Sequence, residues 1–258
     1  MKVYILTDIE GVAGVANFED YSYSTGRFYP LSRHLLTLEV NAAVEGALEA
    51  GATQVVVWDG HGPGGVNVEE LHPEAWLLHG TGVPRTLCLD ESYHALFFVG
   101  QHAMSRAARA GMAHTYSSRT IEEMRLNGEP IGEFGMRTIL AGCFGVPVVL
   151  VTGDAATRDE ALRCVPNIEA VVVKESLHAT AALTRSPQKS REMIRAGAAR
   201  AVARAEEIEP YRMGGPFTLE IQYKAVEHAD RRAQSPEWTR TDPYTVRRTA
   251  DDFLEIAM

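Results

Sequence analysis

Five short, continuous apolar runs recur along the chain and constrain its fold more than any other feature. They are VYILT (3–7), TQVVVWD (53–59), ALFFVG (95–100), VPVVLVTGD (146–154) and AVVVKE (170–175). Runs of this length without polar alternation are typical of strands that are buried on both faces, as in parallel sheets covered by helices. The sequence therefore predicts an α/β fold with a mostly parallel central sheet flanked by helices.

Helical segments alternate with these runs. Their expected ranges are 32–51, 132–145 and 186–210. Gly51 and Pro210 are typical residues for the end of a helix, and Ser186 followed by Pro187 is a typical start. This order of strands and helices is the one that parallel sheets require, because each return to the same sheet edge needs a crossover connection.

The last part of the chain has a different pattern. Residues 217–223 alternate apolar and polar side chains, which predicts a strand with one exposed face. We expect a single domain over residues 1–258, in which residues from about 211 to 258 form a small C-terminal αβ extension at its edge.

Charge and cysteine content exclude several classes of protein. The net charge is -9 and the pI is about 5.5, without a basic block that would meet nucleic acid or an anionic membrane. The apolar run at the N-terminus is too short for a signal peptide, and no segment reaches membrane-spanning length. Cys88, Cys143 and Cys164 form no CxxC pair, so we expect buried free thiols. A cytoplasmic enzyme or binding protein is the class that remains.

Two carboxylates stand at the end of the first apolar run. Asp8 and Glu10 are two residues apart, so on an extended chain their side chains point to the same face. Neighbouring carboxylates repel each other, and one takes up a proton unless a cation or a hydrogen-bond network compensates the charge. The sequence therefore predicts a compensating group at this position.

Other polar side chains follow the later strands. Binding sites in open α/β sheets lie just beyond the carboxyl ends of the strands. The candidates there are Asp59, His61, Gln101, His102 and Asp154, together with His114 in a loop and Glu133 in the first turn of a helix. Carboxylates and neutral imidazoles are ligands of zinc and related metals, and a carboxylate can bridge two ions. A metal pair would neutralise Asp8 and Glu10 together.

Each of these residues also has a structural interpretation. Asp59 in a DGHG turn can bind its own backbone, and Glu133 can favour a helix N-terminus through the helix dipole. A single histidine beside a strand is more often structural than a ligand. The combination of residues, rather than any one of them, favours the metal site. Cys143 lies in an apolar helical segment and is interpreted as a core thiol.

An ordered set of motifs resembles the DppA-type D-aminopeptidase family of zinc peptidases. The motifs are TDIEG (7–11), WDGHG (58–62), GQHAM (100–104), HTYSS (114–118), NGEPIGEFG (127–135), AGCFGVPVVLVTGD (141–154) and VVKE (172–175). The resemblance implies a dinuclear zinc enzyme, with two Zn²⁺ per chain, that removes N-terminal D-amino acids from short peptides. It also implies a large self-compartmentalising ring of identical chains in the cytoplasm.

Motif positions carry the family's functional residues onto this sequence. They imply the zinc ligands Asp8, Glu10, His61, His102 and Glu133, and the catalytic histidine His114. One departure is Leu6, at a position where the family commonly has serine, so a hydrogen bond near the ligands is in doubt. A further, weaker argument for a homo-oligomer comes from Phe217, Leu219 and Ile221, apolar residues on a late strand that a monomer need not cover.

Two other functions compete with this interpretation. A haloacid-dehalogenase-like magnesium phosphatase would use Asp8, Glu10 and the stretch GDAATRD (153–159). It needs a basic residue, usually lysine, between these motifs, and residues 3–173 contain no lysine. Such a phosphatase would also leave His61, His102 and His114 without a role. A metal-stabilised binding protein would have its ions saturated by protein ligands, whereas five ligands shared by two ions leave positions open for catalysis.

Overall fold

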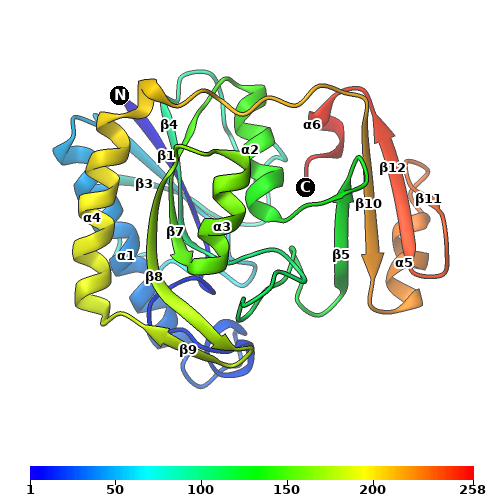
Figure 1. Cartoon of the computed structure of the whole chain (residues 1–258), viewed down its shortest axis with the longest axis horizontal. Coiled ribbons are helices and arrows are strands. Elements are labelled where there is room, and N and C mark those ends of the chain that lie inside the picture. Colours follow the sequence, from blue (N-terminus) through cyan, green and yellow to red (C-terminus); the bar gives the residue numbers. More distant parts are fainter.

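A computed structural model describes residues 1–258 and contains two sheets. The larger sheet has seven strands in the order β3-β2-β1-β4-β7-β8-β9 (Figure 1). Their bounds are β1 Lys2–Thr7, β2 Gln54–Asp59, β3 Ala75–Leu78, β4 Ala95–Gln101, β7 Val148–Asp154, β8 Glu169–His178 and β9 Ala181–Thr184. All neighbours pair in parallel except β9, which runs antiparallel to β8. The predicted fold class, a mostly parallel sheet flanked by helices, is confirmed.

The central strands are buried as their apolar content predicts. Every residue of β4 and β7 is buried, and β1 is buried from Val3 onward. The five predicted strands all form, within a few residues of their expected ends. The short edge strands β3 and β9 were not predicted, because four residues at a sheet edge carry little periodic signal.

Helices cover both faces of this sheet (Figure 1). On one face α1 (Tyr29–Glu49) packs against α4 (Pro187–Ala203), and on the other α2 (Glu133–Cys143) lies beside α3 (Ala155–Cys164). Gly46 permits the close approach of α1 and α4, since a Cβ there would lie 2.1 Å from the carbonyl oxygen of Arg195. The core therefore consists of two layers, one on each side of the sheet.

Helix ends agree in part with the sequence. Gly51 follows α1 with a φ of +97°, the left-handed conformation typical of glycine after a helix. Ser186 caps α4, its side chain accepting a hydrogen bond from the amide of Lys189. However, α4 ends at Ala203 and only a short 3₁₀ turn, η2 (Ala205–Glu207), follows, so the expected extension to Pro210 is wrong.

The second sheet has five strands in the order β11-β12-β10-β5-β6. Their bounds are β5 Ile121–Leu126, β6 Glu129–Pro130, β10 Phe217–Tyr223, β11 Thr239–Arg240 and β12 Thr245–Ala250, with α5 (Val226–Ala233) and the short α6 (Phe253–Ile256) beside them. Residues after 211 thus supply three of the strands, and the middle of the chain supplies β5 and β6. The predicted strand 217–223 lies at the centre of this sheet, between β12 and β5.

Pairing within this sheet corrects one expectation. Phe217, Leu219 and Ile221 are buried within the single chain, and Phe217 packs against Phe253 of α6. They do not form a face that needs a partner, so the argument for an oligomer from these residues is wrong. The pairing of β10 with β5 could not be predicted from local sequence, because β5 lies about 90 residues before β10 in the chain.

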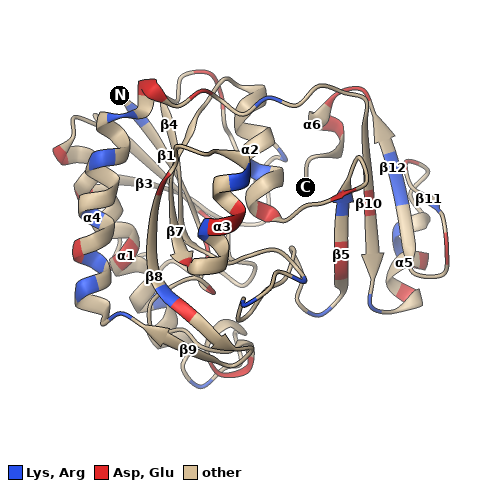
Figure 2. Ribbon diagram, viewed as in Figure 1, with Lys and Arg blue, Asp and Glu red and all other residues tan.

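Basic and acidic residues are interspersed along the chain (Figure 2). Basic residues of α4 meet acids of neighbouring elements, with Arg195 paired to Glu49 of α1 and Arg200 to Glu169 of β8. No helix has both the length and the apolar character required to span a bilayer. The interspersed charges agree with the expectation that the protein has no basic surface for nucleic acid.

Candidate metal centre

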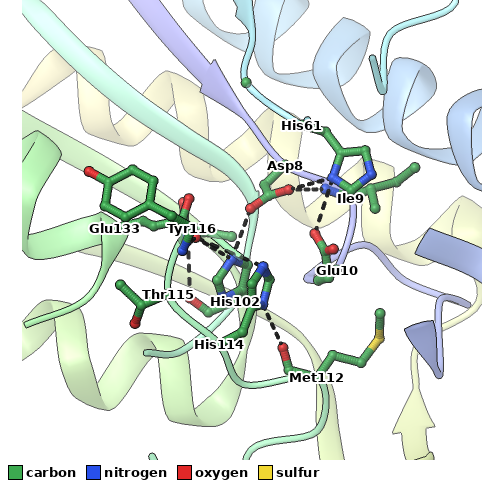
Figure 3. Close-up of polar contacts among 12 residues, drawn as sticks. Asp8, Ile9, Glu10, His61, His102, Met112, His114, Thr115, Tyr116 and Glu133 are labelled. Carbon is green, nitrogen blue, oxygen red and sulfur yellow. Dashed lines mark hydrogen bonds and ion pairs between the residues drawn. The ribbon is translucent and has the colours of Figure 1, made fainter. Parts of the chain in front are cut away.

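Six predicted side chains converge beyond the carboxyl ends of β1, β2 and β4 (Figure 3). They are Asp8 and Glu10 after β1, His61 after β2, His102 after β4, His114 in the loop before β5, and Glu133 at the first residue of α2. Strand order explains the convergence, because β2, β1 and β4 are adjacent in the sheet. The structure therefore brings together the six residues that the motifs implied as ligands or as the catalytic histidine.

Two glycines allow the ends of β1 and β4 to approach. The amide of Gly11 donates a hydrogen bond to the carbonyl of Gly100, at 2.7 Å. A Cβ on Gly11 would lie 2.0 Å from the carbonyl oxygen of Gln101, and one on Gly100 would lie 2.1 Å from that of Asp8. Gly100 also has a φ of +76°, which side chains rarely tolerate. This tight crossing fixes the distance between Asp8 and His102.

The first group of ligand atoms comprises Asp8, Glu10 and His61. Nδ1 of His61 lies 3.1 Å from Oδ1 of Asp8 and 3.5 Å from Oε2 of Glu10. Nε2 of the same ring lies 3.0 Å from the carbonyl oxygen of Ser22. When Nε2 carries the proton and donates it to this carbonyl, Nδ1 presents a lone pair to the two carboxylates. That is the arrangement by which outer hydrogen bonds orient a metal-binding imidazole.

The second group comprises His102, His114 and Glu133. Nδ1 of His102 lies 3.0 Å from the carbonyl oxygen of Ala103, and Nδ1 of His114 lies 3.0 Å from that of Met112. Both rings therefore turn Nε2 toward Glu133, at 3.3 Å for His102 and 3.9 Å for His114. The two imidazoles are stacked, with centroids 3.8 Å apart.

Asp8 connects the two groups (Figure 3). Its Oδ1 faces His61, and its Oδ2 lies 3.0 Å from Nε2 of His102. A single carboxylate thus presents one oxygen to each cluster, which is the position of a ligand shared by two ions.

Unpaired polar atoms support metal binding here. Nε2 of His102 and Oε2 of Glu10 are buried, and neither makes a hydrogen bond despite the short distances to neighbouring charged groups. Buried polar atoms without partners are rare in native proteins and often mark the place of an ion or water.

The buried charged groups of the site shift one another's pKa values. Burial raises the pKa of Asp8, and the adjacent Glu10 raises it further. Burial would also raise the pKa of Glu133, but His102 and His114 lower it to about 2. Burial and the neighbouring His102 lower the pKa of His114, so this imidazole is neutral at pH 7. Burial opposes protonation of His61 and His102, but the neighbouring carboxylates raise the pKa of both well above the usual value, so the site favours positive charge.

A cavity of about 470 Å³ adjoins both groups. This volume is in the range of small-molecule sites in proteins. Besides the metal-competent residues, the wall includes Trp58, Tyr116, Arg119 and Arg137, with Leu6 beside Asp8. The leucine presents no hydrogen-bonding group at the position where the family's serine was expected.

Several other predicted candidates have local structural roles. Asp59 accepts hydrogen bonds from the amides of Gly65 and Val66, so it shapes its own loop. Asp154 caps α3 and accepts from the amide of Thr157 at 2.8 Å. Gln101 lines the cavity. The three thiols are unpaired, but Cys88 and Cys143 are exposed and Cys164 is half-buried, so the prediction of buried thiols is wrong.

Two supporting residues were not predicted. Ser22, in the single π-helical turn η1 (Phe18–Ser22), donates its hydroxyl to Oε1 of Glu10 at 2.5 Å and accepts from His61 through its carbonyl. Lys174 is buried and donates to the backbone carbonyls of Glu10 and Val15. The VVKE motif was a signal for Lys174, whereas no local pattern marks Ser22.

Comparison with known proteins gives consistent results. The family model described as D-aminopeptidase matches residues 1–258. The chain is 30% identical to the D-aminopeptidase of Bacillus subtilis (strain 168), over 99% of this chain and 93% of that protein. It also resembles the solved structure of the Zn-dependent D-aminopeptidase DppA from Bacillus subtilis, described as a self-compartmentalizing protease. That match has a TM-score of 0.92 at 29% identity, covering 99% of this chain and 93% of the other.

Proposed function

Because the chain belongs to the D-aminopeptidase family of peptidases, we propose that it is a zinc-dependent enzyme that removes N-terminal D-amino acids from short peptides. The observation that carries this proposal is the pair of ligand groups joined through Asp8 at the wall of a cavity. The zinc dependence of the Bacillus subtilis relative supports the choice of metal.

The residues divide between two ions in this proposal. Asp8, Glu10 and His61 would hold one zinc ion. Asp8, His102 and Glu133 would hold the other. When bound, such a pair lowers the pKa of a water molecule and polarises the scissile carbonyl. The carboxylates orient the histidines in turn, and the carbonyls of Ser22 and Ala103 fix their tautomers.

His114 is the proposed catalytic residue. Its Nδ1–H donates to the carbonyl of Met112, which leaves the Nε2 lone pair facing the site. Phe18 packs edge-on against the ring, 5.3 Å between centroids, and limits its rotation. A neutral imidazole held in this way takes a proton from the attacking water as the C–O bond forms, and returns it to the amine as the C–N bond breaks. The products are a free amino acid and the shortened peptide.

The competing functions have less support. The stretch GDAATRD forms the start of α3, where Asp154 serves as the helix cap instead of facing the ligand groups. A phosphatase of the type considered would leave His61, His102 and His114 unused. Membership of a peptidase family likewise favours an enzyme over a binding protein.

Metal dependence is the direct test of this proposal. The purified protein is expected to contain about two zinc ions per chain, because Asp8 completes two sets of ligand residues, one with Glu10 and His61 and one with His102 and Glu133. Treatment with a chelator should abolish hydrolysis of a D-alanyl peptide, and added zinc should restore it. Elemental analysis and peptide hydrolysis on the same samples provide the measurement. Full activity in a metal-free sample would refute the proposal, as would a magnesium-dependent phosphatase activity that survives loss of His102.

We propose in addition that the chain forms a homo-oligomer in the cytoplasm. The self-compartmentalizing relative supports the assembly, and the three unpaired thiols agree with a reducing compartment. Leu177 and Leu183, on the hairpin of β8 and β9, are among the most exposed apolar residues and are candidates for the interface.

Light scattering tests the assembly. The expected mass is several times the 28.3 kDa of one chain. A Leu177→Glu, Leu183→Glu variant should form smaller species, since it places charge in the proposed interface. A monodisperse monomer of the wild-type protein at micromolar concentration would contradict an oligomer without affecting the metal site.

A further inference from the structure

A buried arginine in the cavity wall points to a specific feature of the substrate. We propose that Arg137 binds the free C-terminal carboxylate of the peptide, and that the enzyme therefore prefers dipeptides to longer or C-terminally blocked substrates. This inference rests on the proposed aminopeptidase function and adds a specificity-determining residue to it.

Arg137 is held by aromatic side chains. It is only 9% exposed, and its guanidinium carbon lies 5.1 Å from the ring centroid of Trp58 and 5.4 Å from that of Tyr116. Distances below about 6 Å are typical of cation–π contacts. All three residues line the cavity. The stacked rings restrict the guanidinium group without using its N–H donors, so these donors remain available for a ligand.

The charge of Arg137 has no counter-ion within the chain. No carboxylate oxygen lies within 4.0 Å of its guanidinium nitrogens, and its side chain makes no hydrogen bond to protein. Arg248 provides the contrast, because it is equally buried and pairs with Glu237 at 2.8 Å. A buried charge without a partner is costly, so a cationic group left unpaired in a cavity is suited to an anionic ligand.

Helix geometry places Arg137 close to the ligand groups. It lies four residues after Glu133 in α2, so both side chains are on the same face of the helix. A helix rises about 6 Å over four residues. The carboxylate of a dipeptide lies one residue, about 3.6 Å of chain, beyond the scissile carbonyl. Each further residue moves the carboxylate away by a similar distance, which favours the dipeptide.

A carboxylate suits the donors of this residue. The planar guanidinium can form two parallel hydrogen bonds to a carboxylate, which are stronger than neutral ones. Arg119, at the rim of the same cavity and stacked on Tyr23 at 3.9 Å, adds positive potential along the approach. A peptide could supply the carboxylate from its C-terminus or from an acidic side chain, and the test separates these sources.

The test compares three substrates of the zinc-loaded enzyme. They are D-alanyl-D-alanine, its C-terminal amide, and the amide of D-alanyl-D-aspartate, which keeps a side-chain carboxylate only. We expect kcat/KM for the free acid to exceed that for its amide by about 10- to 100-fold. This is the effect expected when hydrogen bonds between charged groups are lost. In Arg137→Gln this ratio should fall to near one, mainly through KM for the acid. Arg137→Lys should give an intermediate ratio, because lysine keeps the positive charge but lacks the planar guanidinium that forms two parallel hydrogen bonds.

Controls separate specificity from folding. Arg158→Gln changes an exposed arginine on α3, outside the cavity, and should retain the wild-type ratio. Zinc content and melting temperature are measured on every variant. If Arg137→Gln does not fold, the wild-type ratio and Arg137→Lys still decide the question.

Three results would overturn the inference. Equal kcat/KM of the wild-type enzyme for acid and amide would show that the C-terminal carboxylate is not bound, with the aminopeptidase function intact. Faster cleavage of the aspartyl amide than of the free acid, dependent on Arg137, would assign the residue to a side-chain carboxylate. An unchanged ratio in a folded, zinc-loaded Arg137→Gln enzyme would make Arg137 structural. Hydrolysis of none of the peptides by the zinc-loaded wild type would instead refute the proposed function itself.

Discussion

Replacement of His114 by alanine is expected to lower kcat by about 10²- to 10⁴-fold while the zinc content stays at the wild-type level. The ring is fixed by Met112 and Phe18, and its Nε2 faces the site, so the variant removes a positioned proton acceptor. His114 is also within ligand distance of His102 and Glu133. Activity and zinc content must therefore be measured on the same preparation.

The control for this experiment is His79→Ala, since His79 is exposed and has no part in either ligand group. That variant should keep both activity and zinc. If His114→Ala loses zinc, the residue is a metal ligand and the proposed catalytic role is wrong. If His114→Ala remains fully active, the imidazole serves only to hold its loop.

Replacement of Asp8 by alanine is expected to reduce the metal content below about one ion per chain and to abolish hydrolysis. Its two carboxylate oxygens face different ligand groups, so a single substitution removes a ligand from each ion. His61→Ala should have a smaller effect on metal content, because it disturbs only the group formed with Asp8 and Glu10. Elemental analysis of the three proteins, prepared in parallel, gives the comparison.

Asp59→Asn is the matched control for Asp8, since both acids follow neighbouring strands. Asp59 binds the amides of Gly65 and Val66, so its loss should lower stability by about 1 kcal/mol while zinc is retained. An Asp8→Ala protein that keeps two ions per chain would show that Asp8 is not shared between them. Two ligand sets with a different bridging group would then be required.

The sequence alone determined the central sheet and the composition of the ligand groups. The apolar runs predicted β1, β2, β4, β7 and β8, because strands buried on both faces need continuous hydrophobic segments. The general position of sites in α/β folds then selected Asp8, Glu10, His61 and His102 as candidates. The same rule also selected Asp59, Gln101 and Asp154, which lie outside the ligand groups. His114 and Glu133 lie outside strand ends, and their selection depended more on the family motifs.

Only the tertiary structure showed which side chains from distant segments contact and orient one another. Ser22 orients His61 and Glu10 from a π-helical turn, and Trp58 and Tyr116 hold Arg137 from separate loops and strands. The pairing of β5 with β10 and the exposure of Cys143 could not be predicted from the sequence either. A local pattern reports periodicity and propensity within about one helix or strand. Contacts between distant segments depend on how the elements pack. The absence of a charge partner for Arg137 could therefore be recognised only in the folded structure.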